Sequence, residues 1–444
     1  MKRKFLNFLP KNRKSLLLHI YARHQELAYG RFYPRPQNNN KQQRFSKNSN
    51  KIFLIGMVTS PHFQKWIKGC VDTKSFSEIH IFPSDRYKKI PVFYSSLEDK
   101  SRIVIHDFGF AGNYGGYYFS HIADLLFAHS WRALLLAKKI MRVKPGIIHF
   151  HEMQKGSYIF NYIFDFPKIR DKTINIISTW GSDLEIYSRL TDPMYKKSLS
   201  ASHMMQSNLS LSWADILTAE RSSEIVRARE LSFSGEFISP VYITVGMKQS
   251  DIWQNPSKCS TRKQIIIKGY QHDAGRALNA LAAIKNLGQD AKEIPVKVFS
   301  ASESVKIEIQ LMRNLGFDIE ELKSISHQEM LQEFARSRVY LGISVSDGLS
   351  TSMVEAMSQG CFPVQSENSA APYFLQNFKS GIVVNPWDIP SIEEAITFAM
   401  GNDSLVDQAQ EINKAKILSD YSYEEGTTRM QHLYSKAKNL LLDI

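Results

Sequence analysis

Two acids, Asp347 and Glu355, lie eight positions apart around a stretch of small and hydroxyl side chains, SVSDGLSTSMVEAMSQG. The stretch follows an apolar run that predicts a buried strand, and it continues into a helical pattern. Ser350, Thr351 and Ser352 come where that helix is expected to begin, and a helix N-terminus offers unpaired amides and a partial positive charge. Such a helix start suits a diphosphate, and two carboxylates beside it can accept hydrogen bonds from sugar and ribose hydroxyls. The alternative is an ordinary loop with a Ser/Thr cap and two solvated acids.

The elements that must position these residues alternate between strand-like and helical patterns. In the first half of the chain, strand-like runs begin at residues 51, 77, 102, 146, 173 and 214, and in the second half at 264, 295, 338 and 361. This alternation predicts parallel α/β sheets, whose ligands bind beyond the carboxyl ends of the strands. A chain of 444 residues also exceeds what one core normally supports, so we expect two doubly wound domains.

The pattern lapses near residue 246 and restarts near 261, which divides the chain into segments. We predict a basic tail at 1–50, a first domain at 51–245, a linker at 246–260, a second domain at 261–422, and a helix at 423–444 that packs back on the first domain.

Positive charge is concentrated in the tail. The whole chain has a net charge of +13, but residues 1–51 hold thirteen lysines and arginines beside one acid, Glu26. The remainder is therefore close to neutral, which argues against a nucleic-acid partner for the folded body. The tail suits an anionic phospholipid surface, with a merely disordered, solubilising tail as the alternative.

The sequence lacks the motifs that are typical of several classes of protein. The three cysteines, Cys70, Cys259 and Cys361, form no C-x-x-C pair, and no apolar run reaches the ~18 residues of a membrane span. There is no Asp-x-Asp motif, no P-loop and no G-x-G-x-x-G fingerprint. We expect that the protein binds neither a metal nor a cofactor. We also expect that it is cytoplasmic.

The stretch around Asp347 resembles the retaining glycosyltransferases of family 4, whose hallmark is a Glu-x7-Glu motif in a strand, loop and helix. The likeness continues through Glu355-Ala356-Met357, Gly360, Pro363-Val364 and GIVVNPWD at 381–388. Asp347 replaces the first Glu, which shortens the side chain by one methylene and keeps its charge. The resemblance covers roughly residues 52–444 and implies the GT-B architecture, in which two Rossmann-like domains face each other across a cleft.

The resemblance also implies roles. Lys268 and Arg276 are similar to the basic pair that family members direct at the donor diphosphate, and TWGSDL at 179–184 looks like the family's His-Gly-Ser-Asp segment with Trp180 in place of His. The catalytic candidates are therefore Asp183, Asp347 and Lys268. The substrate-binding candidates are Gly269, Arg276, Gly348, Leu349, Ser350, Thr351, Ser352 and Glu355. Surface charge for the two cations and a helix cap for Asp183 are the structural alternatives.

The function that follows is retaining transfer of a hexose-type sugar from a nucleotide-diphosphate sugar to a glycan or lipid-linked acceptor, in cell-envelope polysaccharide synthesis. With the basic tail, we expect peripheral attachment to the inner face of the cytoplasmic membrane. Two alternatives stay open: a nucleotide-sugar epimerase or phosphorylase of the same fold, and a non-catalytic glycan- or nucleic-acid-binding protein.

Overall fold

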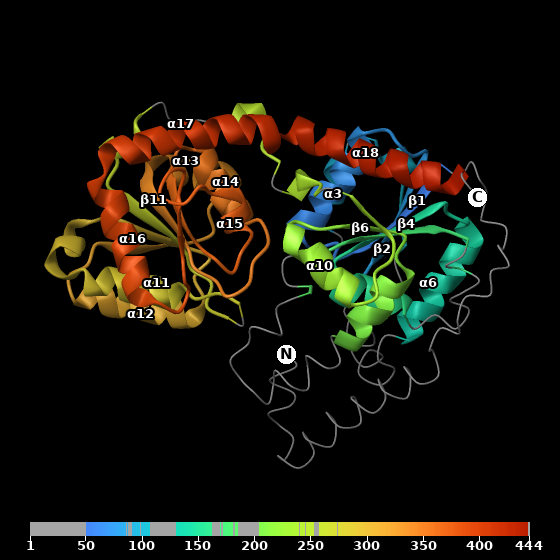
Figure 1. Cartoon of the computed structure of the whole chain (residues 1–444), viewed down its shortest axis with the longest axis horizontal. Coiled ribbons are helices and arrows are strands. Elements are labelled where there is room, and N and C mark those ends of the chain that lie inside the picture. The colour runs from blue at the N-terminus through green and yellow to red at the C-terminus, as the bar shows by residue number, and fades with distance from the viewer. Residues whose placement is uncertain are drawn as a thin grey trace, which may run out of the picture.

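Two parallel β-sheets organise the chain, as a computed structural model shows (Figure 1). The residues described are 50–85, 87, 91–97, 99–106, 130–161, 169, 172–180, 183–184, 204–238, 240–244, 246–252, 257–272 and 274–442. Residues 1–49 of the predicted basic tail lie outside this part of the chain. The predicted α/β fold class with two doubly wound domains is confirmed.

The first sheet has seven strands in the order β3-β2-β1-β4-β5-β6-β7, all paired in parallel. The strands are β1 Lys51–Gly56, β2 Glu78–Pro83, β3 Ile103–Ile105, β4 Ile147–His151, β5 Ile174–Ser178, β6 Ile216–Thr218 and β7 Glu236–Ile238. Every residue of β4 and β5 is buried, because helices cover both faces of a parallel sheet. The order reverses between β1 and β4, which places the crevice of this domain at their carboxyl ends.

Helices of the first domain are short or moderate in length. They are α3 Pro61–Asp72, α4 Phe93–Ser96, α6 Ser130–Val143, α7 Tyr158–Phe160 and α10 Ser222–Glu230, with a π-helical turn at Met153–Ser157. Helix α3 begins with a proline in its first turn, where the missing N–H would have no partner in any case, and it buries Phe63, Trp66 and Ile67 against the sheet.

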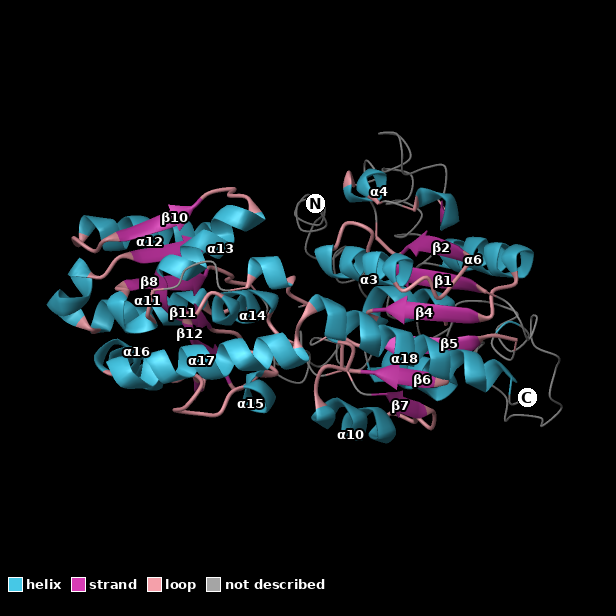
Figure 2. Ribbon diagram, turned by 90° about the horizontal axis from the view of Figure 1, so that it is seen from above, coloured by secondary structure: helices cyan, strands magenta, loops and turns pink. Residues whose placement is uncertain are grey.

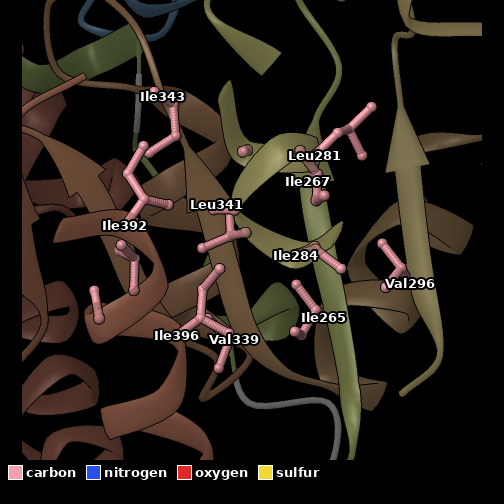
Figure 3. Packing of buried hydrophobic residues seen from close by; sticks show 14 of the residues in the cluster. Ile265, Ile267, Leu281, Ile284, Val296, Val339, Leu341, Ile343, Ile392 and Ile396 are labelled. Atoms are coloured by element: carbon pink, nitrogen blue, oxygen red, sulfur yellow. The ribbon is translucent and has the colours of Figure 1, made fainter. Parts of the chain in front are cut away.

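The second sheet has six strands in the order β10-β9-β8-β11-β12-β13, again all parallel. The strands are β8 Gln264–Lys268, β9 Val296–Phe299, β10 Ile319–Leu322, β11 Ser337–Gly342, β12 Phe362–Ser366 and β13 Ile382–Val384. The helices are α11 Ala277–Asn286, α12 Glu303–Asn314, α13 His327–Arg336, α14 Thr351–Ser358, α15 Ala371–Phe374, α16 Ile389–Gly401, α17 Asp403–Asp420 and α18 Tyr423–Leu442. Figure 3 shows Ile265 and Ile267 of β8 beside Leu281 and Ile284 of α11 in the buried core.

The last two helices span both domains. Helix α17 lies on the second domain, and α18 runs on over the first (Figures 1 and 2). Met430, Leu433 and Tyr434 of α18 are buried in the same core cluster as α3. The chain leaves the first domain beside the point where it returns, since Met247 N donates to Tyr421 O at 2.9 Å and Tyr423 N donates to Met247 O at 2.9 Å. The chain therefore crosses between the domains twice, through two connections that lie side by side. Across the described ranges, no helix has the length and apolar character to cross a bilayer.

Candidate functional site

The loop before α14 and the first turn of this helix form the main candidate site of the second domain. After β11 the chain turns through Asp347 and Gly348 to Ser350, which has extended backbone angles and occupies the N-cap position without a side-chain bond to the helix. Backbone bonds from Asp347 N to Asn368 O (3.4 Å) and from Ala370 N to Gly348 O (3.2 Å) brace this loop from behind. The first-turn amides of α14 thus lie at the end of a fixed loop, where an anion would be stabilised.

Lys268 reaches this loop from the end of β8. The strand register pairs Ile267 with Leu341 of β11, so both chains leave the sheet at the same edge. The Lys268 ammonium lies 3.0 Å from Asp347 Oδ2 and 3.4 Å from Ser350 Oγ. Burial alone would lower the pKa of Lys268, but Asp347, together with Tyr340 and Tyr270, opposes burial and raises that pKa above its ordinary value. Lys268 therefore stays charged, and it brings positive charge to the helix start.

Gly269 lets the chain pass closely behind Lys268. A Cβ at this position would lie 2.8 Å from both the Ala301 Cα and the Phe299 carbonyl, so a larger residue would push β8 away from β9. Gly269 N donates to Phe299 O at 2.8 Å. Its role is to hold the strand end that carries Lys268.

Hydroxyl groups line the first turn of α14. Tyr340 OH lies 3.0 Å from Ser352 Oγ, which lies 3.2 Å from Ser350 Oγ. The Thr351 hydroxyl oxygen is buried and finds no hydrogen-bond partner within the described residues. A buried hydroxyl without a partner costs free energy.

Glu355 is held by a histidine that the sequence did not point to. His327 Nε2, at the start of α13, lies 2.9 Å from Glu355 Oε1. The Glu355 side chain is 11% exposed and the His327 side chain 58%, so the pair opens to solvent on the histidine side. The hydrogen bond with Glu355 raises the pKa of His327 above its usual value. A ribose hydroxyl that binds Glu355 would have to share it with His327.

Arg276 faces its own loop. Its Nη1 donates to His272 O at 2.8 Å and to Gly275 O at 2.7 Å, and its guanidinium stacks 4.6 Å from the centroid of the Trp387 ring. The two predicted cations are therefore arranged differently: Lys268 contacts the α14 loop, whereas Arg276 packs beneath Trp387.

Asp183 lies inside the first domain. Its side chain is 1% exposed, Oδ2 accepts from Trp180 N (2.8 Å) and Met153 N (2.9 Å), and Oδ1 accepts from Gln154 N (3.4 Å). Burial raises the pKa of Asp183 to about 7 in spite of these amides. Both carboxylate oxygens are thus engaged in tying the loop after β5 to the loop after β4, which favours a structural role over the predicted catalytic one.

The first domain approaches the α14 loop with residues absent from the predicted set. Glu220, directly after β6, accepts a hydrogen bond from Leu349 N at 2.7 Å. Lys65 of α3 donates to Thr244 O at 2.8 Å. Burial lowers the pKa of Lys65, and the Glu355 carboxylate opposes this lowering. The signal for Glu220 was its place at a strand end, but its type alone does not separate it from a solvated surface acid.

Across the described residues, no group of three or more His, Cys, Asp and Glu side chains could hold a metal ion. The site consists instead of a lysine, a helix start with its hydroxyls, and carboxylates around them.

Comparison with known proteins connects this geometry to a family. Residues 263–417 match the family model for glycosyl transferases group 1, and this range holds Lys268, Asp347 and Glu355. No curated protein matches the sequence.

Most of the chain is similar in structure to several solved proteins. Sucrose-phosphate synthase from Thermosynechococcus elongatus superposes with a TM-score of 0.68 at 12% identity, with 87% of this chain and 98% of that chain covered. An α,α-trehalose-phosphate synthase (UDP-forming) from Burkholderia vietnamiensis gives 0.64 at 11% identity, with 88% and 97% covered. Anabaena HepE in complex with UDP and glucose gives 0.61 at 12% identity, with 87% and 99% covered. The chain has the GT-B fold of these proteins.

Proposed function

We propose that the protein is a glycosyltransferase that takes a hexose-type sugar from a nucleotide-diphosphate sugar. The observation that carries the proposal is the Lys268–Asp347 pair at the hydroxyl-rich start of α14, inside the range that matches glycosyl transferases group 1. Structures of HepE bound to UDP and to UDP-glucose support a uridine nucleotide as the first candidate donor.

In this proposal the diphosphate lies against the amides of Ser350, Thr351 and Ser352, and its charge is balanced by Lys268. As the bond from sugar to diphosphate breaks, negative charge grows on the leaving oxygen, and a fixed ammonium with aligned amides stabilises it more than the ground state. Asp347 accepts hydrogen bonds from the transferred sugar, and Glu355 from the ribose. Transfer is metal-independent and retains the anomeric configuration, as in family 4.

Arg276 contributes to donor binding only if its side chain leaves Trp387. The bonds from its Nη1 to the carbonyls of His272 and Gly275 join it to its own loop, and such a movement would break them. The acceptor, a glycan or a lipid-linked glycan, enters from the first domain, whose α3 and Glu220 face the α14 loop.

The experiment is a thermal-shift panel of UDP-, GDP- and ADP-sugars on the wild-type protein and on Glu355→Gln. A ligand that binds only the native state raises Tm, so the donor of the panel should give a clear shift in the wild type and a smaller one in the variant. Product analysis with that sugar nucleotide and candidate acceptors then tests transfer. Isomerised sugar nucleotide in the absence of acceptor would indicate an epimerase, and no shift with any member would indicate a protein that has lost donor binding.

We also propose that the basic tail attaches the enzyme to the inner face of the cytoplasmic membrane, where envelope glycans are assembled. Each lysine or arginine near an anionic surface contributes about 1 kcal/mol. The full chain should co-sediment with vesicles that contain phosphatidylglycerol at low salt, and a variant that lacks residues 1–50 should not. Equal sedimentation of the two would contradict the attachment.

A further inference from the structure

One hydrogen bond joins the first domain directly to the proposed donor loop. Glu220 Oε2 accepts from Leu349 N at 2.7 Å, within the short range of bonds to a carboxylate. Leu349 lies between Asp347, proposed to hold the sugar, and Ser350, proposed to begin the diphosphate seat. The position of its amide therefore sets the spacing between the two.

On the second-domain side, the loop is anchored by its side chain. Leu349 is 4% exposed and belongs to the core cluster that contains Ile266 and Met353. With the side chain directed inward, its amide is left to meet an acceptor from outside the domain. The Glu220 carboxylate is that acceptor.

On the first-domain side, the segment that contains Glu220 is held by buried contacts. It follows β6 through Ala219, which is buried, and it precedes a buried ion pair in which Arg221 Nε lies 3.0 Å from Glu224 Oε1. Thr179 Oγ1 donates to Glu224 Oε2 at 2.5 Å, which ties this segment to the end of β5. The segment around Glu220 therefore resists displacement, and the contact with Leu349 can transmit the position of the first domain.

The environment of Glu220 shows that the contact is costly for a charged group. Burial raises the pKa of Glu220 to about 8, and the carboxylates of Glu224 and Asp347 add to the rise, although the Leu349 amide opposes it. Burying an acid beside two other acids costs free energy. The contact also fixes the donor loop relative to the first domain, and this favours catalysis because small displacements of reacting groups lower rates severely.

We propose that Glu220 is a positioning residue for the sugar transfer proposed above, on which this inference rests: its side-chain oxygen holds the Leu349 amide, and with it the loop from Asp347 to Ser350, in register with the first domain. The essential property is an acceptor oxygen of the right length. Glutamine retains that oxygen, whereas alanine removes it.

The test compares Glu220→Ala, Glu220→Gln and the matched control Glu230→Ala with the full-length wild type. Glu230 lies at the far end of α10, the helix that follows Glu220, and its exposed side chain pairs only with Arg227 among the described residues. The probes are UDP-glucose and UDP, or the corresponding sugar nucleotide and nucleoside diphosphate that give the largest shifts in the panel. The readouts are kcat and KM for transfer, the Kd of the nucleoside diphosphate by calorimetry, and Tm.

Glu220→Ala should lower kcat/KM about 10- to 100-fold, mostly in kcat, because the Leu349 amide of the loop loses its acceptor oxygen. The Kd of the nucleoside diphosphate should stay within about twofold, since the helix start and Glu355 are untouched. Glu220→Gln should recover to within about threefold of the wild type, and Glu230→Ala should match it.

Three results would overturn the inference while the proposed function stands: wild-type rates in Glu220→Ala, an equal loss of nucleoside diphosphate affinity, or a Glu220→Gln variant as slow as the alanine variant. A wild-type protein that binds no sugar nucleotide of the panel would overturn the proposed function, and this inference with it.

Discussion

In the first domain, His149 within β4 and Asp183 after β5 point into the protein, whereas at the strand ends of the second domain Lys268 and Asp347 line an accessible loop. His149 is fully buried, with Nε2 2.7 Å from Ser178 Oγ and Nδ1 3.1 Å from Tyr434 OH, and Asp183 is 1% exposed. Lys268 and Asp347 form their ion pair with 18% and 27% of their side chains exposed. Both domains are built on a parallel sheet, but within the described residues the Lys268–Asp347 pair lies at the strand ends of the second domain, and the first domain adds Glu220 beside it.

This difference shows that a polar residue at a strand end is not by itself a functional residue. Burial in a parallel sheet converts such a group into a structural one when a neighbour supplies its hydrogen bonds, as Ser178 and Tyr434 do for His149. His151 differs from His149, because it is fully buried against Phe63 and Trp66 and neither ring nitrogen has a partner in the described part of the chain.

The largest effect is expected at the centre of the second-domain site. Replacing Lys268 with Met should lower kcat/KM for transfer about 10²- to 10³-fold, as the loss of one preorganised charge at a leaving group typically does. Tm should change little, because the loop keeps its backbone bonds to residues 368 and 370. Lys297→Met on β9, which removes an ion pair with Glu320, is the control and should retain activity. Steady-state kinetics with near-normal rates in Lys268→Met would remove the lysine from the mechanism.

In the first domain, the largest effect should fall on stability. Asp183→Ala leaves three buried amides without their acceptor, so the free energy of unfolding should fall by about 3 kcal/mol. The folded variant should transfer sugar within about threefold of the wild-type rate, since that carboxylate faces inward. Urea unfolding and kinetics on one preparation decide the matter: a stable but inactive variant would restore Asp183 as a catalytic residue.

A smaller effect concerns pH and His149. Burial lowers the pKa of His149 to about 3, whereas the unfolded chain takes up this proton near pH 6.5. When the pKa of a base is lower in the folded than in the unfolded state, the protein loses stability as pH falls from the unfolded pKa towards the folded one. The loss should therefore run from pH 6.5 towards pH 3, and it can be followed between pH 6.5 and 4.5. His149→Gln lacks this titration, and the stability gap between wild type and variant should narrow by roughly 2 kcal/mol over that range. Urea unfolding at several pH values would show a constant gap if His149 were not buried and neutral.

The smallest effect is expected at His327. Protonated His327 competes with ligand hydroxyls for Glu355, and the hydrogen bond with Glu355 raises the pKa of His327. His327→Gln should therefore tighten nucleoside diphosphate binding roughly two- to threefold at pH 6 and leave it unchanged at pH 8.5, as befits an exposed pair. Calorimetry at the two pH values measures this difference. Weaker binding at pH 6 would mean that the histidine itself holds the nucleotide.

Much of the fold was predictable because its central strands are continuous apolar runs. Strands β4, β5, β8 and β11 read as such runs. The edge strand β3 was predicted, but the other three edge strands were not: β10 carries Glu320 and Glu321, and β7 and β13 are short, with three residues each.

The site was partly predictable for a similar reason. Lys268 and Asp347 are brought together by strand register, and strand ends could be located from sequence. The inward direction of Asp183, the stacking of Arg276 on Trp387 and the hydrogen bond between Glu220 and Leu349 depend on side-chain directions and on the placement of two domains. Neither the direction of a side chain nor the placement of the two domains can be predicted from the spacing of residues along the chain.

The most direct test of the account is a crystal structure of the wild-type protein soaked with UDP-glucose, or with the sugar nucleotide that most raises Tm. We expect the pyrophosphate to contact the amides of Ser350–Ser352 and the Lys268 ammonium, with the sugar at Asp347 and the ribose at Glu355. Electron density for the ligand at another location, or a helix start that stays filled by the protein's own side chains at saturating ligand, would contradict it.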